Sequence, residues 1–75
     1  MNLIDRFVNE EIACQCSTVE EERFIINFAK GVGFRTYEPY SGKPLYFYNN
    51  SLIEMHFGRR ETHEFSKIFN ERYDG

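Results

Sequence analysis

The stretch "STVEEERFIINFAKG", residues 17–31, decides the fold of this 75-residue chain. A hydroxyl residue stands three positions before an acid twice, as Ser17 with Glu20 and as Thr18 with Glu21. Either pair gives a capping box, in which the two side chains bond to backbone amides at the start of a helix. Glutamates in the first turn also complement the helix dipole. The stretch therefore predicts a helix that begins at its hydroxyl residues.

The residues that follow predict which face of this helix is buried and where it ends. The apolar side chains that recur at helical spacing are Phe24, Ile25, Phe28, Ala29 and Val32. Gly31 follows Lys30 and is suited to the C′ position, with Val32 as its hydrophobic contact. We therefore predict a helix over about residues 18–30.

Two shorter elements are predicted before this helix. Leu3, Ile4, Phe7 and Val8 recur at i, i+1, i+4 and i+5, which predicts a short amphipathic helix. In the segment 12–16, Ile12, Cys14 and Cys16 occupy every second position. Because they alternate, this segment should be a strand with one apolar face.

Three strands and a helix are predicted after it. The strands are Phe34–Glu38, Leu45–Tyr48 and Ser51–Phe57, and Asn49-Asn50 forms a hairpin turn because asparagine tolerates positive φ. Phe65, Ile68, Phe69 and Tyr73 recur at helical spacing and predict a helix over 62–72. A strand over Glu61–Ile68 is the alternative, since this helix lacks a firm cap.

These elements predict one small α+β domain over residues 1–75, in the order α-β-α-β-β-β-α. We expect a mainly antiparallel sheet packed on one main helix, with the other face of the sheet partly open. The connection from the strand at 12–16 through the helix to the strand at 34–38 should be right-handed if those strands are parallel neighbours.

Charge and composition narrow the classes of function. Residues 1–30 hold six acids and three bases, a net charge of −3, whereas residues 31–75 hold six of each. This balance disfavours a generic binder of the phosphate backbone. We predict a soluble cytosolic protein, because the N-terminus lacks a basic signal region, no apolar run is long enough to span a membrane, and two cysteines form no secreted disulfide framework.

The segment "YEPYSGKPLYFYNN", residues 37–50, holds four of the five tyrosines: Tyr37, Tyr40, Tyr46 and Tyr48. On the predicted strand, Tyr46 and Tyr48 point away from Leu45 and Phe47. One interpretation is a second core side covered by a terminal helix. The other is a partner-binding patch, since tyrosine is enriched at interface hot spots.

The same tyrosines also fit a nucleic-acid interface. Exposed sheet aromatics can stack on bases while basic side chains hold phosphates, here Arg35, Lys43, Arg59 and Arg60. The helix-strand-strand-strand-helix order resembles a double-stranded-RNA-binding domain. That family begins its second helix with a basic cluster, whereas this chain has Glu61-Thr62-His63-Glu64 there.

No catalytic or metal signature is found. Cys14, Cys16, His56 and His63 are zinc-type ligands, but the histidines stand about 40 residues away, so buried thiols are the favoured interpretation. A Cys-His nucleophile would lack an orienting third group. The three glutamates at 20–22 are consecutive on a helix, so their side chains point in different directions and cannot converge on one ligand. We predict no cofactor, no metal and no catalytic residue.

The segment "IACQCSTVEEERFIINFAKGVGF" resembles a pattern in small accessory proteins of phages and prophages in Gram-positive bacteria. In those proteins a strand that ends in cysteine is followed by a helix that begins with Thr-x-Glu-Glu and has an apolar face. A glycine and an aromatic residue follow the helix, and a tyrosine-rich hairpin comes next. The likeness covers roughly residues 10–48, and this chain departs from it by ending in a predicted helix. It implies a protein that binds and inhibits a host protein, including defence nucleases. No functional residue carries over, because the shared motif is structural.

The sequence therefore predicts a non-enzymatic binding protein, a phage-type, anti-CRISPR-like inhibitor of a host defence or nucleic-acid-processing protein such as a nuclease. Its anchors would be Tyr37, Tyr40, Tyr46 and Tyr48. The acids Glu20, Glu21 and Glu22 would steer it toward a basic surface. The alternatives are a small nucleic-acid-binding or regulatory module and a homodimer formed through the aromatic face.

Overall fold

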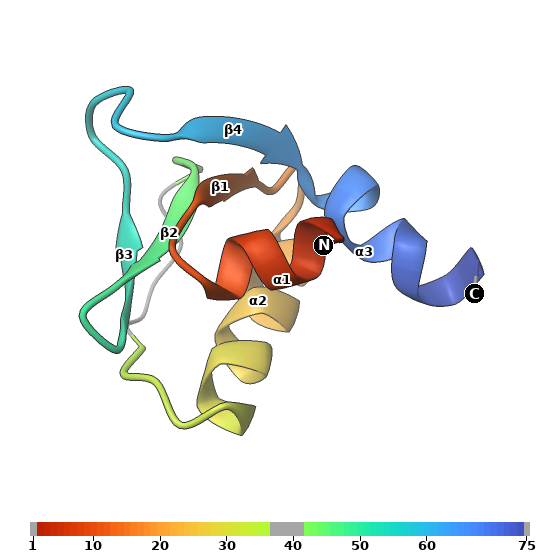
Figure 1. Cartoon of the computed structure of the whole chain (residues 1–75), viewed down its shortest axis with the longest axis horizontal. Coiled ribbons are helices and arrows are strands. Elements are labelled where there is room, and N and C mark those ends of the chain that lie inside the picture. The colour runs from red at the N-terminus through yellow and green to blue at the C-terminus, as the bar shows by residue number, and fades with distance from the viewer. Residues whose placement is uncertain (1, 37–41, 75) are drawn as a thin grey trace.

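The computed structural model describes residues 2–36 and 42–74, with the helical backbone alone for 70–74. Its elements are α1 (Leu3–Val8), β1 (Ile12–Gln15), α2 (Val19–Gly31), β2 (Leu45–Tyr48), β3 (Ser51–Glu54), β4 (Glu61–Glu64) and α3 (Phe65–Asp74) (Figure 1). The α+β class and the predicted order of elements are confirmed. Within the described ranges, no helix has the length and apolar character needed to cross a membrane.

The four strands form one mixed sheet in the order β3-β2-β1-β4. The pairs β1–β2 and β2–β3 are antiparallel, whereas β1–β4 is parallel, with Ile12 opposite Glu61 and Cys14 opposite His63. Both edge strands, β3 and β4, therefore run in the direction of β1. Because the neighbours of β1 are β2 and β4, the anticipated crossover between the strands at 12–16 and 34–38 does not arise.

Two strand predictions need correction. Around residues 34–38 the described part holds a single parallel bridge, between Arg35 and Ser51, while Tyr37 and Glu38 lie outside the described residues. The third predicted strand ends at Glu54 instead of Phe57. Residues 62–64, predicted as the start of the helix over 62–72, belong to β4 together with Glu61, so the alternative of a strand from Glu61 is right for this part. Parallel pairing with β1 decides this, and the helix begins only where the apolar spacing starts, at Phe65.

The start of α2 follows the second of the two predicted capping pairs. Thr18 is the N-cap, and its hydroxyl oxygen accepts a hydrogen bond from the amide of Glu21 at 3.1 Å. The Glu21 carboxylate accepts one in return from the amide of Ser17, at 2.7 Å. Two amides that would otherwise lack a partner are thus satisfied, which fixes the turn from β1 into α2.

The C′ position of α2 lies two residues beyond the predicted glycine, at Gly33. Gly31 is still helical, and Gly33 is the residue with positive φ, at 89°. The amide of Phe34 bonds to the carbonyl of Ala29 at 2.9 Å, and the amide of Gly33 bonds to that of Lys30 at 3.1 Å. These two bonds define a Schellman motif with Gly33 at C′. Val32, predicted on the buried face, is 45% exposed.

Seven of the eight phenylalanines build the core between the helices and the sheet. Phe7 on α1 contacts Phe47 on β2 and Phe69 on α3. From these two rings the contacts continue without a break to Phe24, Phe28, Phe34 and Phe65. Such tilted and edge-on pairs add to the stabilisation from burial alone. All three helices therefore pack on one face of the sheet.

The two faces of the sheet differ as the alternation predicted. Cys14, Leu45 and Phe47 belong to the core cluster on the helix side. Their neighbours in the strands, among them Ala13, Tyr46 and Ile53, point to the opposite side, which we call the outer face. The outer face therefore carries the tyrosines of β2.

Candidate partner-binding site

The connection between β3 and β4, residues 55–60, crosses the outer face. Since β3 and β4 both run in the direction of β1, this segment must return from the end of β3 to the start of β4, and it passes β2 and β1 on the way. The helices occupy the other face, and in Figure 1 the connection lies on the side away from them. At its end, the guanidinium carbon of Arg60 lies 4.3 Å from the centre of the Tyr46 ring. A long-range cation–π contact thus holds the crossing segment against β2.

The tyrosines of β2 lie in different surroundings. Tyr46 is partly buried beneath Arg60, and Tyr48 is 54% exposed at the hairpin end of the strand. Neither lies under a terminal helix, because α1 and α3 pack on the other face, so that interpretation is wrong for this pair. Tyr37 and Tyr40 lie outside the described residues.

Phe57, on the crossing connection, is the phenylalanine that the core leaves out. It is 72% exposed and, in the described part of the chain, makes no ring contact. The sequence placed it at the end of an alternating strand, which gave no sign of this exposure. Together with Tyr46, Tyr48, Arg59 and Arg60 it defines what we call the outer-face surface.

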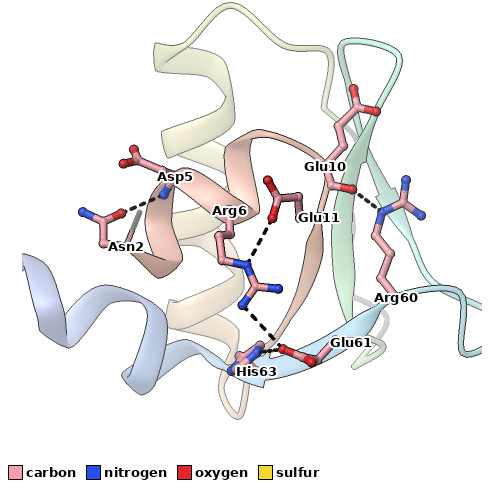
Figure 2. Close-up of polar contacts among 8 residues, drawn as sticks. All are labelled: Asn2, Asp5, Arg6, Glu10, Glu11, Arg60, Glu61 and His63. Carbon is pink, nitrogen blue, oxygen red and sulfur yellow. Dashed lines mark hydrogen bonds and ion pairs between the residues drawn. The ribbon is translucent and has the colours of Figure 1, made fainter.

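Arg60 is held by a second contact at the start of β4. Its Nε donates to the backbone carbonyl oxygen of Glu10 at 2.9 Å, as Figure 2 shows. Glu10 lies in the turn before β1 with φ at 68°, and its carboxylate accepts from the amide of Asn49 at 3.2 Å. Glu10 therefore joins the start of β1, the β2–β3 hairpin and the start of β4.

The four bases proposed for phosphate binding do not gather on one surface. Arg35 borders the edge strand β3, whereas the Arg60 guanidinium lies over Tyr46 on β2. Lys43 pairs with His56, with 2.8 Å between Nζ and Nδ1. Arg59 is exposed beside Arg60. Only the last two lie on the outer-face surface.

The three acids proposed for steering lie on the helix side of the sheet, and one of them is buried. Glu22 is 2% exposed, so it presents no charge to a partner. Glu21 uses its carboxylate in the helix cap. Glu20 is left as the exposed acid of the three. The expected acidic surface therefore does not form.

A small pocket lies where β1 turns into α2. Its volume is about 200 Å³, and it is lined by Cys16, Ser17, Thr18, Val19, Glu22 and Gly42. The capping bonds already occupy the amides of Ser17 and Glu21 at this helix start. These two amides are therefore not open to a ligand in the pocket.

The cysteines lie inside the core, as the sequence favoured. Cys14 and Cys16 are free and buried on the helix side of β1. A hydrogen bond to Cys16, together with burial, raises the pKa of the Cys14 thiol, which therefore stays protonated and poorly reactive. His63 stands opposite Cys14 on β4, but its Nε2 contacts Glu61. Among the described residues no group of three or more candidate ligands could hold a metal ion.

A polar cluster joins α1 to the helix-facing side of β4 (Figure 2). Arg6 donates from Nε to Glu11 at 3.2 Å, and its terminal nitrogen lies 3.7 Å from the Glu61 carboxylate. His63 contacts the same carboxylate. The hydrogen bond and charge of His63, and then the charge of Arg6, hold the pKa of Glu61 below its usual value. This cluster is exposed and fastens the edge strand to the first helix.

Comparisons with family models, with curated proteins and with solved structures find no match for this chain. The resemblance to phage accessory proteins therefore stays a prediction. What bears on function is the geometry of the outer-face surface.

Proposed function

We propose that this chain is a non-enzymatic protein-binding protein that contacts its partner through the outer-face surface. The observation that carries the proposal is the crossing connection, which places an exposed phenylalanine, Phe57, three residues before the restrained Arg60. Aromatic residues and arginine are the types enriched at interface hot spots. Tyr48 adds a second exposed ring on the same face of the sheet.

The geometry favours a protein partner over nucleic acid. A base-stacking platform needs a free aromatic face, whereas Arg60 already covers a face of the Tyr46 ring. Phosphate binding needs clustered bases that are free to bind, whereas Arg35 lies beside β3 and Lys43 is already paired with His56. The net charge of −3 also repels a polyanion.

At a finer level we propose a phage-type inhibitor that acts in the cytoplasm on a host defence or nucleic-acid-processing protein. The resemblance of residues 10–48 to phage and prophage accessory proteins supports this part of the proposal. With Glu22 buried and Glu21 engaged in the cap, the partner surface need not be strongly basic. Contact through the aromatic and arginine side chains takes the place of acidic steering.

The test is a comparison of variants in a pull-down from nuclease-treated bacterial lysate. The baits are tagged wild type, the double variant Tyr48→Ala with Phe57→Ala, and Val32→Ala as a matched control, since Val32 is also exposed but ends α2. We expect one protein to be retained by wild type and by the control and lost from the double variant. The purified pair should then show roughly 30-fold weaker binding in the double variant.

Two results would overturn the proposal. Equal retention by all three baits would place the contact elsewhere. Recovery of nucleic acid alone, or of proteins that disappear after nuclease treatment, would favour the nucleic-acid-binding alternative. Size-exclusion chromatography with light scattering should be run on the same proteins, because a dimer lost from the double variant would identify a second copy as the partner.

A further inference from the structure

We propose that Arg60 is a carboxylate-binding site, and that its terminal nitrogens receive an aspartate or glutamate side chain of the protein partner. This inference rests on the proposed function and adds the chemistry of one partner group. Nothing in the sequence distinguishes Arg60 from Arg59. Its surroundings in the structure do.

The Arg60 guanidinium is held by two contacts before any partner arrives. Its guanidinium lies over Tyr46 at 4.3 Å, and its Nε donates to the Glu10 carbonyl oxygen at 2.9 Å. Glu10 is itself held by Asn49, whose amide donates to its carboxylate, and by its own amide, which donates to Phe7 at 3.2 Å. A side chain with many rotamers normally loses about 0.5–1.5 kcal/mol of entropy when an interface immobilises it. Here much of that ordering is already present.

The remaining donors have the geometry of a carboxylate receptor. An arginine has five N–H groups in a planar fork, and Nε supplies one. Within the described ranges, the terminal nitrogens of Arg60 have no hydrogen bond and no ion pair. Because Nε is occupied, a ligand must approach end-on, across the two terminal nitrogens. A carboxylate matches that edge with two parallel hydrogen bonds.

Nearby charges favour a single carboxylate over a phosphate backbone. Glu61 follows Arg60 directly, and Glu10 lies beside it. A nucleic acid would bring one negative charge per nucleotide past these acids, whereas a protein brings one carboxylate to the fork. Phe57 and Tyr48 would meet the apolar surroundings of that carboxylate.

The direct test follows the arginine Nε–H signals by NMR while sodium acetate replaces sodium chloride at constant ionic strength. The Arg60 signal is assigned by its loss in Arg60→Lys, and Arg35 and Arg59 serve as internal controls. We expect the Arg60 signal to shift along a saturating curve at roughly fivefold lower acetate concentration than either control, because only its fork is pre-oriented. A titration with the oligonucleotide dT10 is run in parallel.

Each outcome decides between the alternatives. An Arg60 response no stronger than that of Arg59 overturns the inference. A response to dT10 without one to acetate assigns the site to phosphate instead. Against the captured partner, Arg60→Lys should weaken binding at least tenfold, while Arg35→Lys, outside the outer-face surface, does not. If the Tyr48 and Phe57 double variant loses the partner but Arg60→Lys keeps it, the proposed function stands and this inference alone fails.

Discussion

Alanine at Phe57 should leave the stability of the fold nearly unchanged, whereas alanine at Phe69 should come close to unfolding it. Phe57 is 72% exposed, so about a quarter of its side chain is buried. Full burial of phenylalanine stabilises a protein by about 1.5–3 kcal/mol, and a quarter of that is about 0.5 kcal/mol. Phe69 is 1% exposed and touches four other rings. Its loss should cost about 3–5 kcal/mol.

These losses must be compared with the total stability of the domain. At about 0.05–0.15 kcal/mol per residue, a chain of this length has an unfolding free energy of about 4–11 kcal/mol. The Phe69→Ala protein would then be partly or wholly unfolded at the lower limit. Phe69→Leu is therefore included as a milder change, with an expected cost of about 1–2 kcal/mol from lost ring contacts.

The assay is equilibrium unfolding in urea, followed by far-UV circular dichroism and by tyrosine fluorescence, which the absence of tryptophan leaves unobscured. Each protein is measured at two concentrations about 50-fold apart. A cost above about 2 kcal/mol for Phe57→Ala at the lower concentration would refute the reasoning, because an exposed ring cannot contribute that much. A cost that emerges only at the higher concentration would instead show that a second copy covers Phe57.

Two further predictions concern the helix cap and the cluster on β4. Thr18→Ala should lower the unfolding free energy by about 1 kcal/mol, because the Thr18 hydroxyl accepts a hydrogen bond from the Glu21 amide. Ser17→Ala should cost far less. Equal losses for the two variants in urea unfolding would place the cap elsewhere. The lowered pKa of Glu61 means that its contribution is present above its ordinary pKa of 4.5 and is lost as the pH falls through the folded value. The stability difference between wild type and Glu61→Gln should therefore shrink between about pH 7 and pH 2.5, and a constant difference would contradict this sign.

The elements that the sequence predicted well are those set by local chemistry. The start of α2 is defined by two hydrogen bonds, and each of them joins residues no more than four positions apart in the sequence. The sequence assigns the C′ position to Gly31, but Gly33 suits it equally, and only the hydrogen bond from Phe34 to Ala29 selects Gly33. The burial of Glu22 could have been predicted from the sequence. It precedes Ile25, Ile26 and Ala29 by three, four and seven positions, which is the spacing of one helix face.

The elements that the sequence missed depend on partners far along the chain. Residues 61–64 show no apolar alternation, so a strand there was only the alternative to a helix. They form one because β1 has a free edge beside them. The outward side of Tyr46 was predicted from alternation alone. Its contact with Arg60 was not, because the two residues meet only when the connection from β3 recrosses the sheet.

The case for a binding surface comes from two features that the core does not require. A single exposed apolar side chain is common on protein surfaces, so Phe57 alone would decide little. Arg60, however, is restrained by Tyr46 and Glu10. Within the described residues its terminal nitrogens stay unpaired, so the guanidinium charge has no ion pair there. Protein interfaces combine apolar contact, which gives affinity, with charge-assisted hydrogen bonds, which fix orientation. The exposed Phe57 ring and the oriented Arg60 guanidinium place both on one short connection. Seven phenylalanines fill the core without either side chain.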